Sequence, residues 1–534
     1  MIGGALFAGC SGELANSTDL LPRVETPAWP DSVAVNDIDT LELRVTLPNS
    51  ESVTGLRLRW QSSDPTKLDV QAWPVRSGSR ADSLAAQLKA ITVARARDSA
   101  VTITVTVDQP GFVPATMQRT IAVMERWTAV SVGESQTCAL TVGASAYCWG
   151  SGQGLGNPGV TVTAVPAAVR GAHLFHSLSA GDRQVCGEVD DGLTYCWGFN
   201  GYGALGDLTQ ITHVTPAPVT GGNFVTMDVG NEFACGILLD DGTTQCWGNQ
   251  AYGQLGEGPA YTYCTSFAEF AVICRPGMVF GASVRITNGS QATRNQYCTQ
   301  NRQDTSACPL ALSSVSAGAD HACGVIRTVQ AVFCWGRNAS GQVGGKPFDS
   351  SCIPDPYIVG PCSAFGTLAS QDTGWHTSEA AYSGPRFATV SAGTAHTCGL
   401  TVAGQAYCWG SNQNGEFGNG SFQSSPFPVP GASGIRFSSL SAGNGHTCGI
   451  DASAVALCWG LNGHGELGNP TAGTTSATPV AVSGGHHFAS VSAGSGTTCG
   501  VTMPAGAVYC WGQNLGNGTD SMSAVPVRIA EPAQ

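Results

Sequence analysis

The chain is short of charge, and the charge that it has is of the wrong sign for nucleic acid. Only 11% of its 534 residues are charged, and the formal net charge is −13. Phosphate backbones are bound by clustered lysine and arginine. Residues 127–534 contain 12 basic and 23 acidic side chains, with Lys346 as their one lysine. This balance predicts that the protein binds no nucleic acid and is not drawn to anionic lipid surfaces.

Three kinds of motif are also missing. No Cys-x-x-Cys pair occurs, which argues against a zinc site built on cysteines. No stretch approaches the roughly 18 apolar residues that a membrane-spanning helix requires. No grouping of nucleophile, acid and base is typical of a catalytic site. We therefore expect no cofactor, no metal and no enzymatic activity.

Glycine and short apolar runs are abundant instead. The chain has 70 glycines and is 42% hydrophobic, which excludes a disordered protein. Many short β-branched runs with few charges are typical of all-β structure. Because 534 residues exceed one ordinary core, several domains or a repeat array are expected.

The 21 cysteines are regularly spaced. Regular pairs in such number are typical of disulfide bonds formed in an oxidising compartment. Cys10 is left over from the pairing. Seven pairs are ten or eleven residues apart: Cys138 with Cys148, Cys186 with Cys196, Cys235 with Cys246, Cys323 with Cys334, Cys398 with Cys408, Cys448 with Cys458, and Cys499 with Cys510. The three remaining pairs are Cys264 with Cys274, Cys298 with Cys308, and Cys352 with Cys362.

The first residues suggest export and anchoring. Residues 1–9 are mostly apolar and lead into Leu6-Phe7-Ala8-Gly9-Cys10, which resembles a bacterial lipobox. The resemblance implies that 1–9 is a signal remnant, that Cys10 is lipidated, and that the lipid is the only membrane anchor. The alternative is an apolar tail with a free cysteine. Residues 10–23 are polar and are expected to be a linker.

Residues 24–125 alternate apolar and polar positions in short runs, such as Val101-Thr102-Ile103-Thr104-Val105. A period of two predicts half-buried antiparallel strands, and about 100 residues suit a β-sandwich. The segment Trp60-Gln61-Ser62-Ser63-Asp64-Pro65 resembles an element of the second group of bacterial Ig-like domains. In surface proteins such modules are usually spacers.

One unit recurs seven times between residue 126 and residue 534. The copy at 390–418 reads Val-Ser-Ala-Gly, Cys398, a turn at Gly404, Cys-Trp-Gly from Cys408, and Asn-x-x-Gly-x-Phe-Gly. A repeat of about 50 residues is typical of propellers and solenoids. A glycine always stands five residues before the first cysteine: Gly133, Gly181, Gly230, Gly318, Gly393, Gly443 and Gly494. A tryptophan always follows the second cysteine: Trp149, Trp197, Trp247, Trp335, Trp409, Trp459 and Trp511.

This unit resembles the regulator-of-chromosome-condensation repeat, with its V-x-x-G-x-x-H strand, W-G hairpin and N-x-x-G-Q-L-G turn. The resemblance implies an all-β, seven-bladed β-propeller over 126–534. The cysteine pair is the main departure, and only secreted members would use it. The family includes a secreted propeller that blocks β-lactamases and members with exchange activity toward a small nuclear GTPase.

Hairpin geometry supports the cysteine pairs. Cys398 and Cys408 are equidistant from Ala403, so a turn there places them opposite each other on adjacent strands. The adjoining tryptophan is expected to pack between blades. His321, His396 and His446 stand two residues before a blade cysteine, where a structural role is favoured over a metal or acid–base role.

Ring closure is expected to use the end of the chain. Most copies are preceded by a P-x-x-V-like strand, such as Pro479-Val480-Ala481-Val482, but the first copy lacks one. A spare copy, Val525 to Ile529, stands near the C-terminus. We expect it to complete the sheet of the first blade.

Two insertions interrupt the repeat, at 259–309 and 346–384. They fall after the same turn of consecutive copies, so they are expected to lie side by side on one face. They hold the three additional cysteine pairs and several aromatic and arginine side chains, which are frequent in binding hot spots. The predicted partner-binding residues are Tyr261, Tyr263, Arg294 and Trp375. The alternative is that the insertions are neutral additions to a tolerant surface.

These features favour a lipid-anchored or secreted, extracytoplasmic binding or scaffold protein. We expect a monomer with a protein or glycan partner. A secreted enzyme inhibitor is the first alternative, on the family resemblance, and an enzyme or exchange factor is the weaker second.

Overall fold

The structure is a computed structural model. It describes residues 23–25, 32–34, 38–46, 57–63, 68–72, 83–90, 100–108, 115–124, 126–190, 192–220, 222–240, 242–256, 278–285, 312–327, 330–344, 367–368 and 384–530. The chain divides into two compact units, Met1–Arg126 and Trp127–Gln534.

Some of the predicted residues lie outside the described residues. They are Cys10, the four predicted partner-binding residues and the additional cysteine pairs Cys264 with Cys274, Cys298 with Cys308, and Cys352 with Cys362. The lipid attachment and the three additional disulfides therefore stay predictions.

The first unit contains two four-stranded sheets, with strand orders β1-β3-β6-β5 and β2-β8-β7-β4. The second sheet mixes the parallel pair β2–β8 with antiparallel neighbours. Its assignment to the Ig-like class stays a prediction. The strands are β1 (Arg23–Glu25), β2 (Ser32–Ala34), β3 (Ile38–Thr46), β4 (Arg57–Ser62), β5 (Leu68–Ala72), β6 (Ser83–Ala90), β7 (Ala100–Asp108) and β8 (Ala115–Met124).

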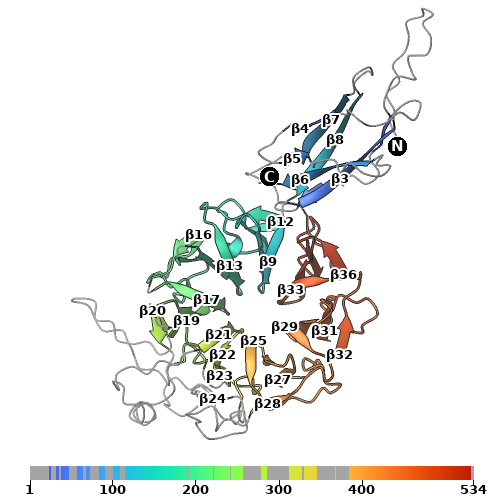
Figure 1. Ribbon diagram of the computed structural model, residues 1–534. Coiled ribbons are helices and arrows are strands. Elements are labelled where there is room, and N and C mark those ends of the chain that lie inside the picture. Colours follow the sequence, from blue (N-terminus) through green and yellow to red (C-terminus); the bar gives the residue numbers. More distant parts are fainter. Residues whose placement is uncertain are drawn as a thin grey trace, which may run out of the picture. The chain divides into compact units, whose positions relative to one another are not determined.

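The second unit is a ring of seven four-stranded antiparallel sheets, which confirms the predicted seven-bladed propeller (Figure 1). The strands of each blade follow one another in chain order from the axis outward. Blade 1 is β9 (Trp127–Val132), β10 (Gln136–Thr141), β11 (Ala146–Ser151) and β12 (Val162–Ala168), with a 3₁₀ turn η3 (Gln153–Leu155). Blade 2 is β13 (Phe175–Ala180), β14 (Gln184–Val189), β15 (Thr194–Gly198) and β16 (His213–Pro218).

The next five blades repeat this plan, and their bounds are as follows. Blade 3 is β17 (Phe224–Val229), β18 (Phe233–Leu238), β19 (Thr244–Asn249) and β20 (Met278–Arg285); blade 4 is β21 (Leu312–Ala317), β22 (His321–Ile326), β23 (Val332–Gly336) and β24 (Thr367–Leu368); blade 5 is β25 (Phe387–Ala392), β26 (His396–Thr401), β27 (Ala406–Gly410) and β28 (Ser425–Pro430); blade 6 is β29 (Phe437–Ala442), β30 (His446–Asp451), β31 (Ala456–Leu461) and β32 (Thr475–Ala481); blade 7 is β33 (Phe488–Ala493), β34 (Thr497–Thr502), β35 (Val508–Gly512) and β36 (Ser523–Arg528).

The blade cysteines pair as the hairpin geometry predicts. In every blade the two cysteines are direct cross-strand partners on the second and third strands. All seven pairs form disulfides with Cα atoms 4.0–4.1 Å apart, and all are fully buried in the cores of the ring. The confirmed disulfides join Cys138 to Cys148, Cys186 to Cys196, Cys235 to Cys246, Cys323 to Cys334, Cys398 to Cys408, Cys448 to Cys458, and Cys499 to Cys510.

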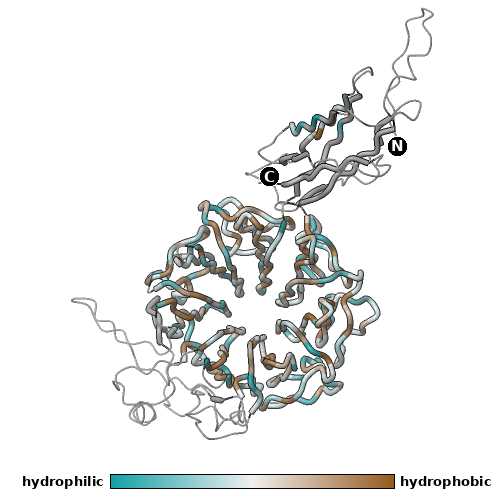
Figure 2. The backbone as a smooth tube through the Cα atoms, viewed as in Figure 1, coloured by the Kyte–Doolittle hydropathy of each residue, from teal (hydrophilic) through white to brown (hydrophobic). Residues whose placement is uncertain are grey.

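The hydrophobic core is divided into packets between adjacent blades, and hydrophobic stretches recur in every blade of the ring (Figure 2). The seven tryptophans are all fully buried. Each indole N–H donates to a backbone carbonyl of the preceding blade at 2.7–3.2 Å, as Trp459 does to Glu416. The prediction that these tryptophans pack between blades is confirmed.

The predicted route of ring closure is wrong. Strand β36 pairs with β35 and completes blade 7, and blade 1 has its own fourth strand, β12. The P-x-x-V-like strands therefore follow the hairpin of their own blade. The ring closes by packing of blade 7 on blade 1, where Trp127, Val132 and Trp149 share a core with Val501 and Leu515.

Both insertions contain a strand of the propeller. β20 pairs with β19 and β24 pairs with β23, so each insertion supplies the fourth strand of its blade. The additional residues are therefore split into two segments per blade, 257–277 and 286–311 in blade 3 and 345–366 and 369–383 in blade 4. The expectation that each insertion is a single connection is therefore wrong. The expectation that the two insertions lie side by side on one face concerns residues outside the described ones and stays a prediction.

Replacing both Cys398 and Cys408 by alanine should lower the free energy of unfolding by about 2–3 kcal/mol, because a loop of about ten residues is no longer closed in the unfolded chain. Denaturant unfolding under oxidising conditions measures the change. The single exchange Val402→Ala, at an exposed position on the same hairpin, is the control and should have little effect. Equal stability of the double variant and the wild type would contradict a structural role of the disulfide.

Candidate binding face at the axial mouth

The loops between the first and second strands of the seven blades meet around the ring axis. They enclose a cavity of about 170 Å³, which we call the axial mouth, lined by the repeated glycines and the residues beside them. Cavities that hold drug-sized ligands are roughly 300–1,000 Å³. The axial mouth is therefore too small for such a ligand and can hold waters or one small polar group.

The repeated glycine marks the closest approach of neighbouring blades. A Cβ atom built on Gly393 would lie 2.6 Å from the carbonyl oxygen of Gly443, and one on Gly443 would lie 2.6 Å from that of Gly494. The series continues around the ring and ends with Gly494 against the Gly133 carbonyl. A side chain at this position would force two blades apart, which explains why the glycine is present in every copy.

One step further out, the serine of each Val-Ser-Ala-Gly copy bridges two blades. The Ser391 hydroxyl accepts the N–H of Ala442, and five other blades repeat this bond. Blade 3 has Asp228 instead, whose carboxylate accepts hydrogen bonds from Ser179, Ser316 and the N–H of Ala317. Burial raises the pKa of Asp228, and these hydrogen bonds oppose the increase. The ring is thus not symmetric at its inner wall.

The rim of the mouth carries charged and aromatic side chains on blades 2–4, which we call the charged sector. On blade 2, the Arg183 guanidinium lies 4.1 Å from the centroid of the Phe199 ring. The same guanidinium forms ion pairs with Asp182 and, across the blade boundary, with Glu232. Arginine over an aromatic ring combines cation–π attraction with a flat, exposed contact area.

A second arginine is held in the same way between blades 3 and 4. The Arg337 guanidinium lies 4.9 Å from the Tyr252 ring centroid and 3.0 Å from Asp320. The side chain of Arg337 and the residue Tyr252 are 45% and 46% exposed, so both are available to a partner. Two arginine–aromatic pairs therefore stand on adjacent blades.

The carboxylates of the charged sector and Glu134 of the adjoining blade 1 influence one another. The pKa of Glu134, on blade 1 at the mouth, is raised by burial and by the negative charges of Asp182 and Asp320, while Arg183 acts in the opposite direction. The pKa of Glu232 is raised by burial, and its pairing with Arg183 opposes that rise. The rim thus has four carboxylates and two guanidinium groups, which leaves an excess of negative charge.

The other half of the rim is small and neutral. The counterparts of Arg183 on blades 5–7 are Ala395, Gly445 and Gly496. The counterparts of Phe199 are Ser411, Leu461 and Gln513, which show that this position tolerates polar and apolar residues alike. Because blades 5–7 fold without arginine or aromatic residues here, the charged sector is not required by the repeat.

The three predicted histidines are structural. His321, His396 and His446 are fully buried, and each Nε2 atom lies 2.8–2.9 Å from a threonine hydroxyl of the next blade. Each hydroxyl donates to the same carbonyl that accepts the tryptophan N–H, as Thr447 and Trp459 do to Glu416. Since the hydroxyl proton is used there, it accepts from Nε2–H, which fixes the neutral tautomer.

In six of the seven blades the residue at the histidine position varies with the residue that faces it in the next blade, whereas blade 7 has Thr497 opposite Thr137 of blade 1. Where the next blade offers Thr397, Thr447 or Thr498, the position is histidine. Where it offers Val185, Ala234 or Ala322, the position is glutamine or phenylalanine: Gln136, Gln184 and Phe233. The glutamines donate to backbone carbonyls of the next blade instead. This pairing across the repeat is the signal that assigns the histidines to blade contacts.

Burial lowers the pKa of His321 to about 3 and the pKa values of His396 and His446 to about 4. The unfolded chain binds these protons below about pH 6.5, whereas the folded chain does not. Stability should therefore fall as the pH is lowered from about 6.5 to 4, by about 1.4 kcal/mol per pH unit for each histidine. Thermal unfolding across this range measures the slope.

The variant His396→Gln introduces the residue that blades 1 and 2 have at this position. It should reduce the slope of the unfolding free energy against pH by about 1.4 kcal/mol per pH unit, because one proton fewer is taken up on unfolding. Its control is His487→Gln, because His487 is exposed. An unchanged slope in His396→Gln would show that another group causes the acid sensitivity.

Among the described residues, neither a metal-binding cluster nor a membrane-spanning helix is found. No group of three or more histidine, cysteine or acidic side chains among them could hold a metal ion. No helix in the same ranges is long and apolar enough to cross a membrane. Sequence reasoning missed Arg183, Phe199, Tyr252 and Arg337. Arg183, Phe199 and Arg337 differ in type from the residues at the equivalent positions of blades 5–7, whereas Tyr252 has Tyr202 and His464 among its counterparts and leaves no such signal.

The comparisons with known proteins agree with the repeat. The family model described as "Regulator of chromosome condensation (RCC1) repeat" matches residues 191–237 and 403–450, and a second model of this description matches 387–416. The chain therefore carries RCC1-type repeats, as the sequence resemblance implied. The matched segments span the hairpins and turns that form blades 2, 3, 5 and 6.

Solved structures support the same fold. Yeast RCC1 (Prp20), solved bound to Kap60, is 18% identical over 76% of this chain and 84% of its own, with a TM-score of 0.53. Human WBSCR16 is 15% identical over 71% of this chain and 87% of its own, with a TM-score of 0.52. Prp20p from Saccharomyces cerevisiae, solved in a study of its binding properties to Gsp1p and histones, is 17% identical over 76% of this chain and 87% of its own, with a TM-score of 0.53. At these identities the likeness concerns the fold.

Proposed function

We propose that the protein is an extracytoplasmic scaffold that binds a protein partner through the charged sector of its axial mouth. The observation that carries this proposal is the pair of arginine–aromatic contacts on adjacent blades, Arg183 on Phe199 and Arg337 on Tyr252. Blades 5–7 fold without them, so packing does not account for their presence. Arginine and tyrosine are the residue types enriched in binding hot spots.

A protein partner is favoured over a glycan because the aromatic rings of the charged sector are already covered on one face. Sugars stack on open aromatic faces, whereas one face of both Phe199 and Tyr252 is covered by a guanidinium group. The guanidinium groups and the carboxylates beside them suit the charged and polar side chains of a protein surface. The negative excess of the rim further favours a partner surface with positive charge.

The insertion of blade 3 contains predicted partner-binding residues that lie outside the described residues. The segment 257–277 starts after the turn that follows β19 and ends where β20 begins, and Met278 pairs with Asn249 at the mouth end of the sheet. Tyr261 and Tyr263 belong to this segment, and we propose, from the sequence alone, that they contribute to partner binding. Arg294 and Trp375 follow β20 and β24 in the chain, and we treat them as a separate hypothesis.

An extracytoplasmic location is supported by seven buried disulfides, which would not persist in a reducing cytosol. The lipid anchor on Cys10 rests on the sequence resemblance alone. The propeller itself would act as a rigid support, since each blade is closed by its disulfide and bonded to both neighbours.

Exchanging Arg183, Tyr252 and Arg337 together for alanine should leave the thermal unfolding temperature nearly unchanged, because exposed ion pairs contribute about 0–1 kcal/mol each. Capture of the partner from the native cell-surface fraction should fall at least tenfold, measured by cross-linking and quantitative mass spectrometry. The matched control, Thr394→Ala with Ser411→Ala, changes the neutral half of the rim and should bind normally. Equal loss in both variants would argue against a specific role of the charged sector.

Membrane attachment is tested separately at Cys10. The variant Cys10→Ser should move the protein from the membrane pellet to the soluble extracytoplasmic fraction, because one thiol is the proposed lipid attachment point. Fractionation with immunoblotting measures the distribution, and Ser11→Ala is the control. A membrane-bound Cys10→Ser variant would show that the anchor lies elsewhere, without bearing on the charged sector.

A further inference from the structure

Glu188 places a carboxyl group where every other blade has an apolar core residue. It lies on β14 of blade 2, two residues after the first cysteine, and its side chain is only 3% exposed. The residues of the other six blades at this position are all apolar and buried: Leu140, Ile237, Val325, Leu400, Ile450 and Val501. Folding of a blade therefore does not require a carboxyl group here.

Glu188 faces the core packet between blades 2 and 3. Side chains two positions apart on a strand lie on the same side of the sheet. Cys186 of the same strand packs with Phe224 and Trp247 of blade 3. In blade 1, Leu140 packs on blade 2 in the same manner. The Glu188 carboxyl group thus lies at the contact of two blades, beside apolar side chains.

The surroundings of Glu188 give little support to a negative charge. Its Oε2 accepts a hydrogen bond from the Ser177 hydroxyl at 2.5 Å. Its Oε1 is buried without a hydrogen-bond partner among the described residues, and so is Oγ1 of Thr194, the cross-strand partner of Glu188. Asp228, which is also buried at this boundary, accepts four hydrogen bonds. Because a buried charge is costly unless it is hydrogen-bonded, ionisation is better tolerated at Asp228 than at Glu188.

Few charged groups surround Glu188 in the described part of the chain. On its own blade, Nδ1 of the half-exposed His176 lies 3.9 Å from Glu188 Oε2. From blade 3, Asp228 contacts serines of blades 2 and 4, and Glu232 pairs with Arg183 of blade 2 at the mouth. Burial raises the pKa of Glu188, while the hydrogen bond from the serine on β13 and the charge of His176 oppose the increase.

We propose that Glu188 is a proton-controlled latch between blades 2 and 3, which closes the boundary when the carboxyl group is protonated and loosens it when the group is ionised. Protonation makes Oε1 a hydrogen-bond donor, and Thr194 Oγ1 on the adjacent strand is an unused acceptor. Ionisation leaves a negative charge beside apolar side chains, and opening of the boundary lets water solvate that charge. The latch rests on contacts within the ring and does not depend on the proposed function.

Hydrogen exchange of the full chain, followed by mass spectrometry, measures how often the boundary opens. Protection factors of β14 and β17 should fall as the pH rises above 4.5, the ordinary pKa of a glutamate, until Glu188 is ionised in the closed state as well. The fall should reach up to about tenfold per pH unit, because the closed boundary retains one proton that the open boundary releases. Strands β26 and β29 are the internal control, since their boundary has Leu400 in place of Glu188, and their protection should not fall.

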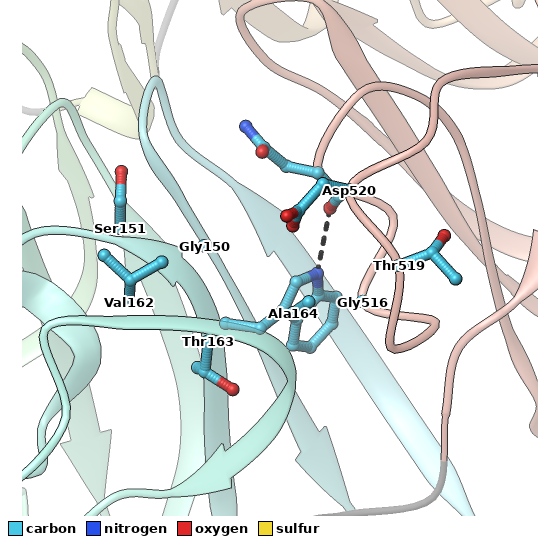
Figure 3. Close-up of a pocket in the computed structure, with 10 residues that line it drawn as sticks. Gly150, Ser151, Val162, Thr163, Ala164, Gly516, Thr519 and Asp520 are labelled. Atoms are coloured by element: carbon cyan, nitrogen blue, oxygen red, sulfur yellow. Dashed lines mark hydrogen bonds between the residues drawn. The ribbon is translucent and has the colours of Figure 1, made fainter.

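Two variants remove the carboxyl group. Glu188→Leu introduces the residue that blades 1 and 5 have, and Glu188→Gln keeps the shape of the side chain. In both variants the loss of protection per pH unit should be smaller by up to about tenfold. Asp228 is unchanged in both, so its own titration cancels in the comparison with the wild type. The matched control is Asp520→Asn, which removes an exposed carboxylate beside a pocket of about 50 Å³ between blades 7 and 1 and should behave as the wild type (Figure 3).

The protonation state of Glu188 is measured independently by infrared difference spectra of the wild type minus Glu188→Gln. The C=O band of the protonated carboxyl group should disappear over the same pH range as the protection. The latch is overturned if the wild type and Glu188→Leu lose protection equally, or if the boundary of blades 5 and 6 loses as much as that of blades 2 and 3. A carboxyl group that is already ionised throughout the range in which protection falls would overturn it as well.

Discussion

The contact on which the ring depends is the hydrogen bond from each tryptophan indole to a carbonyl of the preceding blade. All seven indole groups are buried, and all seven donate within 2.7–3.2 Å. An indole can be buried at little cost only where its N–H finds an acceptor. The turn that offers this carbonyl therefore has to stand at the same height in every blade. This requirement explains why the Cys-Trp-Gly triplet and the turn after it recur in every blade. The glycines at the axis recur as well, because the blades are then held so close together that a side chain would not fit.

Apart from the packing of the tryptophans between blades, the contacts that the sequence could predict are those made within one copy of the repeat. The disulfide register follows from a hairpin centred near Ala403, and the blade count follows from the number of copies. Pairing of the fourth strand could not be settled in this way. Val525–Ile529 and its counterparts can be drawn as the first strand of the next blade or the last strand of their own, because local alternation is the same in both cases. The structure selects the second arrangement, which leaves the first blade complete. The ring is closed by side-chain packing and hydrogen bonds between blades 7 and 1, without a sheet that they share.

The site was less accessible to sequence reasoning, for a different physical reason. The insertions were conspicuous by length, whereas Arg183, Phe199, Tyr252 and Arg337 replace single residues inside well-formed copies. Such changes become visible only when the seven copies are placed in structural register and buried positions are separated from exposed ones. The same comparison explains the histidines. In six copies, histidine occurs opposite threonine, and glutamine or phenylalanine occurs opposite alanine or valine; blade 7 departs from this with Thr497 opposite Thr137. The recurrence of histidine in three copies therefore reflects a partner in the next blade.

A ring of identical blades would present seven equal surfaces and could not hold one partner in one orientation. Specific binding by such a protein therefore has to use the places where the copies differ. The inner wall differs at Asp228, and the rim differs on blades 2–4. At the inner wall, the Asp228 carboxylate is satisfied within the protein, since it accepts four hydrogen bonds from protein groups. On the rim the change leaves exposed arginine–aromatic pairs, groups that a partner can contact. Exposed departures that the fold does not compensate by itself are thus where this propeller is equipped to bind.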